Sequence, residues 1–157
     1  MNYLHEEYLH YQKKIGQKLD PSNWMQITQK KIDKFAQLTQ DPQFIHTDPI
    51  KAKLDSPFEK TIAHGFLVLS FASKFALDVL PPLKKKEVRI NYGFNKVRFI
   101  HPVLVDSKIR GIFILKNIEK KNNLSLISTC LSSIPLPVPA TIPLLLVRCT
   151  KTGNRLR

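Results

Sequence analysis

The sequence lacks any run of roughly 18 or more apolar residues, although 43% of its 157 residues are apolar. A membrane-spanning helix needs about 20 such residues in a row, so the sequence predicts no membrane partner. The first residues, MNYLHEEYLHYQKK, are polar and acidic where a secretory signal would be apolar. We therefore expect a cytoplasmic protein built around a single globular core.

Cysteine is scarce, which weakens any prediction of a metal or disulfide framework. Cys130 and Cys149 lie outside any CxxC spacing, and the five histidines form no tight cluster in the sequence. Zinc sites usually show closely spaced cysteine or histidine ligands. The sequence therefore predicts no metal site and two ordinary thiols.

Acidic residues are absent from the last 38 positions, which carry six basic residues. Up to Glu119 there are 19 basic and 12 acidic residues, a net charge of +7, and the tail supplies the remaining +6 of the total +13. A basic surface can attract nucleic acid, anionic lipid or a phosphorylated small ligand, while scattered lysines also form ordinary solvated surface. Nucleic acid is not predicted as a partner, because no aromatic and basic interleaving or known motif accompanies the charge.

The order of predicted elements is helices first and strands later. A helical lead-in, a short strand and two helices precede a long apolar helix, and strands follow; the expected ranges are 1–20, 24–27, 28–40, 49–54, 61–80, 88–94, 103–118 and 124–129. The apolar phase slips by one residue near Gly93, which predicts a β-bulge or sharp bend there. This order indicates an α+β fold with the long helix packed on an antiparallel sheet.

Asp41 and His46 form the first candidate pair for chemistry. Pro42 disfavours helical geometry at Asp41, and Asp48-Pro49 resembles the start of a new helix, so His46 should lie in a brief connector between two helices. A carboxylate and an imidazole can share one water, one accepting its proton while the other orients it. The alternative is that Asp41 caps a helix end and His46 fills a loop.

Gly65 is the third candidate, because it comes early in the long apolar helix. A backbone amide at a helix N-terminus can donate to a thioester oxygen that gains negative charge. A glycine placed there for close packing explains the residue equally well. His64, its neighbour, is interpreted as a satisfied core histidine or a supporting residue behind the pair.

These residues lie in a recognisable pattern. Residues 35–52 resemble the hydratase motif of the MaoC-like acyl dehydratases, the (R)-specific enoyl-CoA hydratases, and the matching positions are Phe35, Ala36, Thr39, Asp41, His46, Asp48 and Ala52. TIAHGFLVLS at 61–70 is similar to the second block of the family, and residues 90–111 are similar to its strand segment. Trp24 and QITQ at 26–29 resemble the nodulation-protein-N-like branch. The resemblance covers about residues 16 to 120.

The resemblance implies a hot-dog fold, in which a curved antiparallel sheet wraps a long central helix, and it implies a homodimer. It implies reversible hydration of trans-2-enoyl-CoA to (R)-3-hydroxyacyl-CoA. Asp41 and His46 would then activate the water, and the Gly65 amide would be the oxyanion donor. No metal or redox cofactor is implied, since coenzyme A is part of the acyl-CoA substrate.

The resemblance also suggests residues that bind the substrate. Ser73 falls where the family lines its acyl pocket. Lys96 and Arg98 are candidates for contacts with the phosphates of coenzyme A, because family CoA sites lie along the dimer groove. Two other readings stay open: a non-catalytic acyl-CoA-binding or accessory hot-dog protein, and a hot-dog thioesterase, although thioesterases lack this Asp-His block.

Several positions depart from the family pattern. Gln40 replaces the usual glycine, Gln43-Phe44 replaces Asn-Pro, and Asp106 stands where a turn glycine is usual. After about Asn123 the resemblance ends, and residues 134–147, IPLPVPATIPLLLV, carry four prolines. Proline lacks the backbone N–H of a ladder, so this segment predicts a poor central strand. We therefore assign 1–123 to the hot-dog domain and 124–157 to an atypical tail with disrupted strands, and hypothesise that a reading-frame shift produced it.

Overall fold

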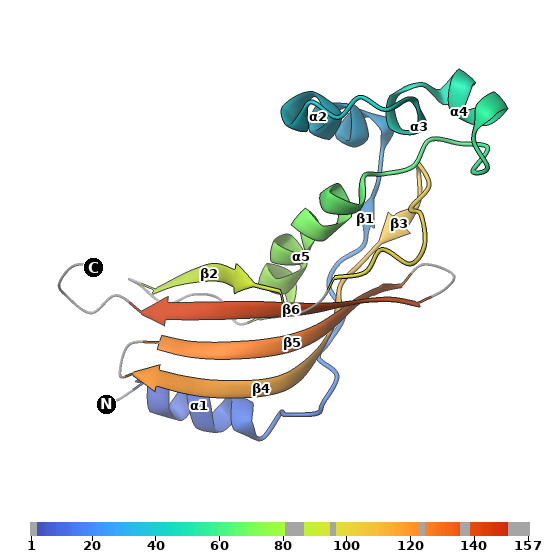
Figure 1. The fold of residues 1–157 in the computed structure, drawn as a ribbon. Helices are drawn as coiled ribbons and strands as arrows, with labels where there is room; N and C mark the ends of the chain where they lie inside the picture. The colour runs from blue at the N-terminus through green and yellow to red at the C-terminus, as the bar shows by residue number, and fades with distance from the viewer. Residues whose placement is uncertain (1–2, 81–86, 95–96, 123–124, 136–138, 151–157) are drawn as a thin grey trace.

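The computed structural model describes residues 3–80, 87–94, 97–122, 125–135 and 139–150. Five helices come first and most of the strands follow (Figure 1). The helices are α1 (Tyr3–Gln12), α2 (Gln29–Thr39), α3 (Phe44–Thr47), α4 (Pro49–Asp55) and α5 (Gly65–Val79). The strands are β1 (Met25–Gln26), β2 (Glu87–Gly93), β3 (Lys108–Ile109), β4 (Ile112–Asn122), β5 (Ser125–Pro135) and β6 (Pro139–Thr150).

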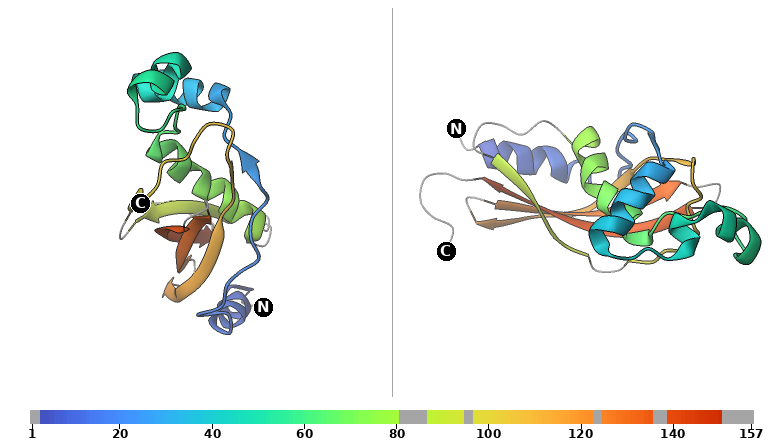
Figure 2. Two further views of the ribbon diagram at one scale, coloured as in Figure 1. Left: turned by 90° about the vertical axis from the view of Figure 1, so that its right-hand side faces the viewer. Right: turned by 90° about the horizontal axis from the view of Figure 1, so that it is seen from above.

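The main sheet has four antiparallel strands in the order β2-β6-β5-β4. α5 lies against one side of this sheet, α1 lies beside β4, and α2, α3 and α4 gather at the far end of α5 (Figures 1 and 2). The α+β class and the antiparallel sheet predicted from the sequence are confirmed. None of the described helices is long and apolar enough to cross a membrane.

Residues 139–147 of the segment predicted to be a poor central strand lie in β6, one of the two inner strands of the sheet, whereas residues 134–135 end β5 and Pro137 lies outside the described residues. That prediction is wrong, and the strand register explains how the prolines fit. Pro135 and Pro139 pair with each other at the closed end of the β5–β6 hairpin. Pro143 pairs with Leu131 on the β5 side, whereas the β2 ladder reaches only as far as Leu145. A missing N–H is tolerated where one side of a strand has no ladder partner. Whether residues 124–157 arose from a shifted reading frame stays a prediction.

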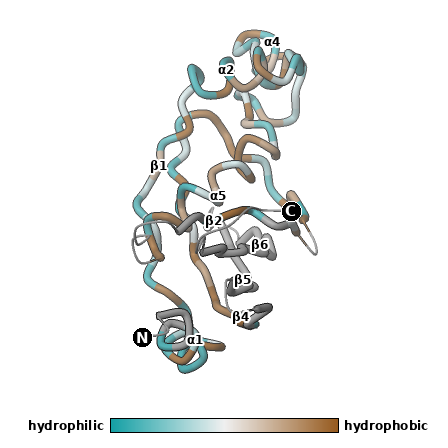
Figure 3. The backbone as a smooth tube through the Cα atoms, turned by 90° about the vertical axis from the view of Figure 1, so that its left-hand side faces the viewer, coloured by the Kyte–Doolittle hydropathy of each residue, from teal (hydrophilic) through white to brown (hydrophobic). Residues whose placement is uncertain are grey.

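The core lies where α5 meets the segments leading into β4. Its buried members are Ile27, Ile32, Ala63, Leu67, Val68, Ala72, Phe75, Ala76, Val103, Ile109, Phe113 and Leu115. Much of the tube between the α2–α4 region and the sheet is apolar, while polar stretches gather on α2 and α4 (Figure 3). The buried face of α5 runs through Leu67, Val68 and Phe75, whereas Phe66 is 68% exposed.

The long helix begins four residues later than the predicted start at residue 61. Thr61 and Ala63 exchange backbone hydrogen bonds with Val105 and Val103, and Ile62 forms a bridge with Leu104. Because this neighbouring chain uses their backbone groups, these residues are extended, and Gly65 becomes the first residue of α5. The same contact keeps residues 103–107 out of the strand predicted for 103–118.

Other boundaries agree with the sequence. The register of β2 shifts between Asn91 and Gly93, which confirms the predicted bulge. The side chain of Asp48 accepts a hydrogen bond from the Lys51 N–H at 2.9 Å and so caps α4 as predicted.

Two positions where the family pattern has glycine adopt a left-handed backbone. Gln40 has φ 57° and Asp106 has φ 66°. Glycine reaches this region without steric strain, and an L-residue with a Cβ reaches it only at a cost in free energy. The two substitutions of glycine therefore fall on strained backbone.

Candidate active site

Asp41 lies directly after α2, where the helix stops. Gln40 is the left-handed C-cap of α2, and the Asp41 N–H donates to the Ala36 carbonyl at 3.0 Å. These backbone constraints turn the Asp41 side chain out of the helix, as Pro42 led us to predict. The carboxylate is 44% exposed and is thus open to solvent or substrate.

His46 lies within α3, a single helical turn, where the sequence suggested an irregular connector. The ring is 7% exposed, and Nδ1 lies 2.7 Å from the carbonyl oxygen of Ile62. A carbonyl oxygen only accepts, so Nδ1 carries the proton and Nε2 of the neutral ring keeps its lone pair. The Ile62 N–H in turn donates to the Ile45 carbonyl at 2.9 Å, which holds the two segments together on both sides of the ring.

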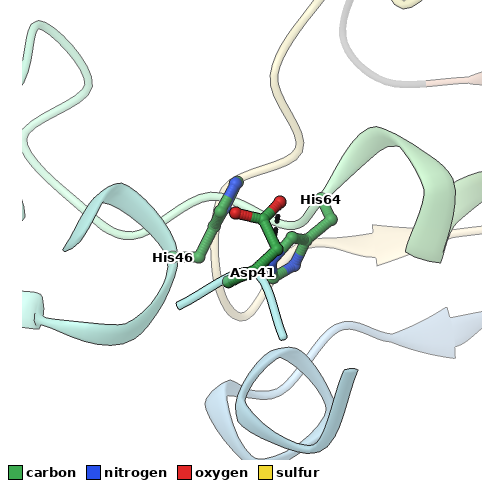
Figure 4. A group of neighbouring side chains, drawn as sticks. All are labelled: Asp41, His46 and His64. Atoms are coloured by element: carbon green, nitrogen blue, oxygen red, sulfur yellow. Dashed lines mark hydrogen bonds and ion pairs between the residues drawn. The ribbon is translucent and has the colours of Figure 1, made fainter. Parts of the chain in front are cut away.

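The fold brings Asp41 and His46 together, with His64 beside them (Figure 4). One donor atom from each of the three side chains lies within 4.8 Å of the other two. A single water forming two hydrogen bonds of about 2.8 Å spans separations up to roughly 5.6 Å. The carboxylate of Asp41 and the ring of His46 are therefore close enough to hold one water between them.

The environment of His46 favours the neutral ring. Burial lowers the pKa of His46 below its ordinary value of about 6.5, and neighbouring His64 lowers it further. The hydrogen bond to the Ile62 carbonyl and the carboxylate of Asp41 act in the opposite direction and raise it. The net result is an imidazole with a free lone pair near neutral pH, as a general base requires.

His64 takes a larger part in this cluster than the sequence suggested. It is 4% exposed, and its Nε2–H donates to the backbone carbonyl of Asp41 at 2.9 Å. Its ring stacks on the ring of His46, with centroids 3.7 Å apart and 25° between the planes. The interpretation as a satisfied histidine holds for Nε2 and is wrong for Nδ1, which is buried with no hydrogen-bond partner among the described residues.

The three side chains also raise the question of a metal ion. Two imidazoles and a carboxylate are familiar metal ligands. The sequence did not show this group, because His64 is far from the other two residues along the chain. The lone pairs of an imidazole lie in the ring plane, however, and two rings stacked with centroids 3.7 Å apart and 25° between the planes keep them in two nearly parallel planes. One ion requires converging lone pairs, so the observed stacking suits a shared water better than a chelated metal.

Gln29, at the start of α2, supports the pair from behind. Its Nε2 donates to the His46 carbonyl at 2.7 Å, and its Oε1 accepts from the Thr61 hydroxyl at 2.5 Å. The amide thus connects α2, the His46 turn and the extended segment before α5. The sequence showed Gln29 only as part of the QITQ stretch; its role depends on contacts across 17 and 32 residues.

Gly65 is the first residue of α5, directly after His64. The first amides of a helix have no partner within the helix and lie at the positive end of its dipole, which suits a developing oxyanion. The packing alternative also has support. A Cβ built on Gly65 would lie 2.8 Å from the ring of Phe99, closer than real Cβ atoms approach.

Ser73, Arg98 and Lys96 are the remaining predicted site residues. Ser73 is eight residues along α5 from Gly65, about 12 Å of helix, and its hydroxyl accepts from Asn91 at 2.7 Å. Arg98 is exposed and precedes Phe99, which packs on Gly65. Lys96 lies outside the described residues. The acyl and CoA contacts of these three stay predictions.

This site occurs within a recognised family: the chain matches the MaoC like domain over residues 10–132, and it belongs to that family. The structural neighbours share its hot-dog fold of a long helix on an antiparallel sheet. The match extends nine residues past Asn123, into β5.

Particular relatives are similar over most of the chain. Nodulation protein N of Rhizobium leguminosarum bv. viciae is 41% identical over 116 residues, covering 74% of this chain and 72% of that protein. The 3-hydroxyacyl-thioester dehydratase Z of Mycobacterium tuberculosis is 41% identical over 108 residues, or 69% of this chain and 70% of the dehydratase. A solved structure, the monoamine oxidase regulatory protein from Archaeoglobus fulgius, has a TM-score of 0.70 and 26% identity, covering 88% of this chain and 92% of its own.

Proposed function

We propose that this protein is a hydro-lyase that reversibly hydrates trans-2-enoyl-CoA to (R)-3-hydroxyacyl-CoA. The observation that carries the proposal is the approach of the Asp41 carboxylate and the His46 ring to within reach of one water. The similarity to a 3-hydroxyacyl-thioester dehydratase supports the reaction class. The (R) configuration rests on family membership and on the fold shared with an (R)-hydratase from A. caviae.

The reaction needs one base, one acid and a stabilised enolate. His46 Nε2 accepts a proton from the water while Asp41 accepts the second hydrogen bond and orients it, and the water oxygen bonds to C3 of the enoyl thioester. Electrons move to the thioester oxygen, which the Gly65 N–H stabilises. As they return to C2, this carbon takes up the proton that His46 accepted, so His46 is also the acid and its ring ends neutral. Water adds across the double bond with no net change in oxidation state, so the proposed reaction needs no redox cofactor.

Crotonyl-CoA is the simplest substrate for a test. We expect the wild-type protein to hydrate it, and Asp41→Asn and His46→Gln to lower kcat by about 10²–10⁴-fold. Acyl-CoA binding, measured by calorimetry, should survive both substitutions. Unchanged turnover in Asp41→Asn contradicts the proposal.

Other outcomes distinguish the alternatives. Binding of crotonyl-CoA without turnover by the wild-type protein would favour a non-catalytic acyl-CoA-binding or accessory role. Release of free CoA, detected with a thiol reagent, would favour a thioesterase.

The functional unit that we propose is a homodimer. Phe66, Phe99 and Ile100 are 68%, 48% and 53% exposed, and the rings of Phe66 and Phe99 contact each other edge to face at 5.6 Å. Adjacent exposed aromatic side chains beside Gly65 are typical of an interface rather than of solvated surface. Light scattering should give twice the chain mass, and Phe66→Lys should give a monomer; an unchanged mass in that variant excludes this face.

A further inference from the structure

His64 has no role in the proposed chemistry, yet it contacts every part of the site. It is the N-cap residue of α5, so its peptide leads directly into the Gly65 amide. Its Nε2–H donates to the backbone carbonyl of Asp41 at 2.9 Å, and the same nitrogen lies 3.9 Å from the Asp41 carboxylate. One side chain therefore joins the start of the long helix to the chain that carries the carboxylate.

The ring of His64 also limits the position of His46. The two rings stack at 3.7 Å, and His64 meets the ring of Phe35, on α2, at 5.1 Å and 54°. Since the Nδ1–H of His46 is fixed on the Ile62 carbonyl, the remaining freedom of that ring is a tilt about this hydrogen bond. A flat ring packed against its face opposes that tilt.

Packing alone does not explain why this ring is a histidine. Nδ1 of His64 is buried with no partner among the described residues, and an orphaned buried nitrogen lowers stability. A phenylalanine would fill the same space and stack on His46 without that penalty. Unsatisfied buried polar atoms in folded proteins call for an explanation, and a functional site is a common one.

We propose that His64 is a positioning residue of the hydration site. Its Nε2–H fixes the backbone at Asp41, and the face of its ring fixes the ring of His46. The Asp41 carboxylate and the His46 imidazole therefore keep hydrogen-bonding distance to one water opposite the Gly65 amide. This role rests on the proposed hydratase function. His64 and Asp41 are also the titratable groups that act on the charge of His46.

Three variants separate this role from a structural one. His64→Phe keeps a flat ring on His46 but removes the N–H donor to Asp41. His64→Gln keeps an N–H donor at the reach of Nε2 and removes the ring. Phe75→Leu is the control for destabilisation, because Phe75 is 1% exposed and lies ten residues along α5 from Gly65, about 15 Å of helix.

We expect His64→Phe to lower kcat for crotonyl-CoA at least tenfold with KM changed less than threefold, as for an interaction made in the transition state. His64→Gln should recover part of this loss, and Phe75→Leu should leave kcat per folded molecule unchanged. In His64→Phe the acidic limb of the pH–rate profile should move upward, because His64 is one of the groups that lower the pKa of His46. An unchanged kcat, a loss confined to KM, or a loss equal to that of Phe75→Leu overturns the proposal.

A further readout does not depend on activity. The ¹⁵N chemical shifts of the His46 ring report its tautomer and its titration, and they can be measured in the substrate-free protein. His64→Phe should move the His46 titration upward while Phe75→Leu leaves it in place. If the wild-type protein fails to hydrate crotonyl-CoA, the proposed function fails, whereas ¹⁵N shifts and a titration of the His46 ring that are identical in the wild type, His64→Phe and His64→Gln refute the positioning role itself.

Discussion

Gln40 offers a direct test of the strain that the structure assigns to the approach to Asp41. Its backbone is left-handed, with φ 57° and ψ 36°, and its side chain is exposed. A left-handed conformation costs an L-residue about 1–2 kcal/mol, and glycine gives back roughly 0.5–1 kcal/mol through its greater freedom in the unfolded chain. Gln40→Gly should therefore raise the free energy of unfolding by about 0.5–1 kcal/mol.

Urea and thermal unfolding followed by circular dichroism measure this change. A gain of this size corresponds to a rise in Tm of roughly 1–4 °C for a chain of this length. Gln40→Ala is the matched control, because it removes the same side chain but keeps the Cβ and its strain. It should stay within about 0.5 kcal/mol of the wild type.

Asp106→Gly provides an internal comparison. Asp106 is also left-handed, with φ 66°, but aspartate tolerates this region better than glutamine does. The gain at residue 106 should be the smaller of the two. If Gln40→Gly is no more stable than Gln40→Ala, backbone strain at this position is not the reason for the family glycine.

Two further predictions follow from the site. The pKa of His46 is lowered, so the contribution of this ring to the free energy of unfolding is complete above about pH 6.5 and is lost as the pH falls through the lowered value. The value of kcat/KM should fall over the same acidic range, and His46→Gln should remove this fall. A fall that begins above pH 6.5 contradicts the prediction. Gly65→Ala should lower the free energy of unfolding by about 1–3 kcal/mol, because the new Cβ meets Phe99. Most of that loss should vanish in a Phe99→Ala background, and equal losses in both backgrounds exclude this contact as the cause.

Local signals allowed much of the site to be predicted. Pro42 and the left-handed C-cap end α2 at the predicted place, and Asp48 caps α4 as its sequence suggested. Asp41 and His46 are five residues apart, so a short segment between two helices keeps them close whatever the rest of the fold does. Proximity of this kind can be read from a sequence.

Features that depend on distant segments were not predictable in this way. His64 is 18 residues from His46 and reaches it only because the chain around residues 103–105 holds residues 61–63 extended. The same pairing delays the start of α5 to Gly65, although the apolar pattern begins earlier. Likewise, an inner strand can contain Pro143 because the β2 ladder ends at Leu145, and the positions of the prolines in the sequence do not show where that ladder ends.

A double-mutant cycle on crotonyl-CoA hydration tests the central claim most directly. If Asp41 and His46 hold the same water, each substitution alone abolishes its use, and Asp41→Asn/His46→Gln should be no slower than the slower single variant. Losses in kcat that multiply in the double variant would show that the two side chains act on separate steps, and they would contradict the shared water.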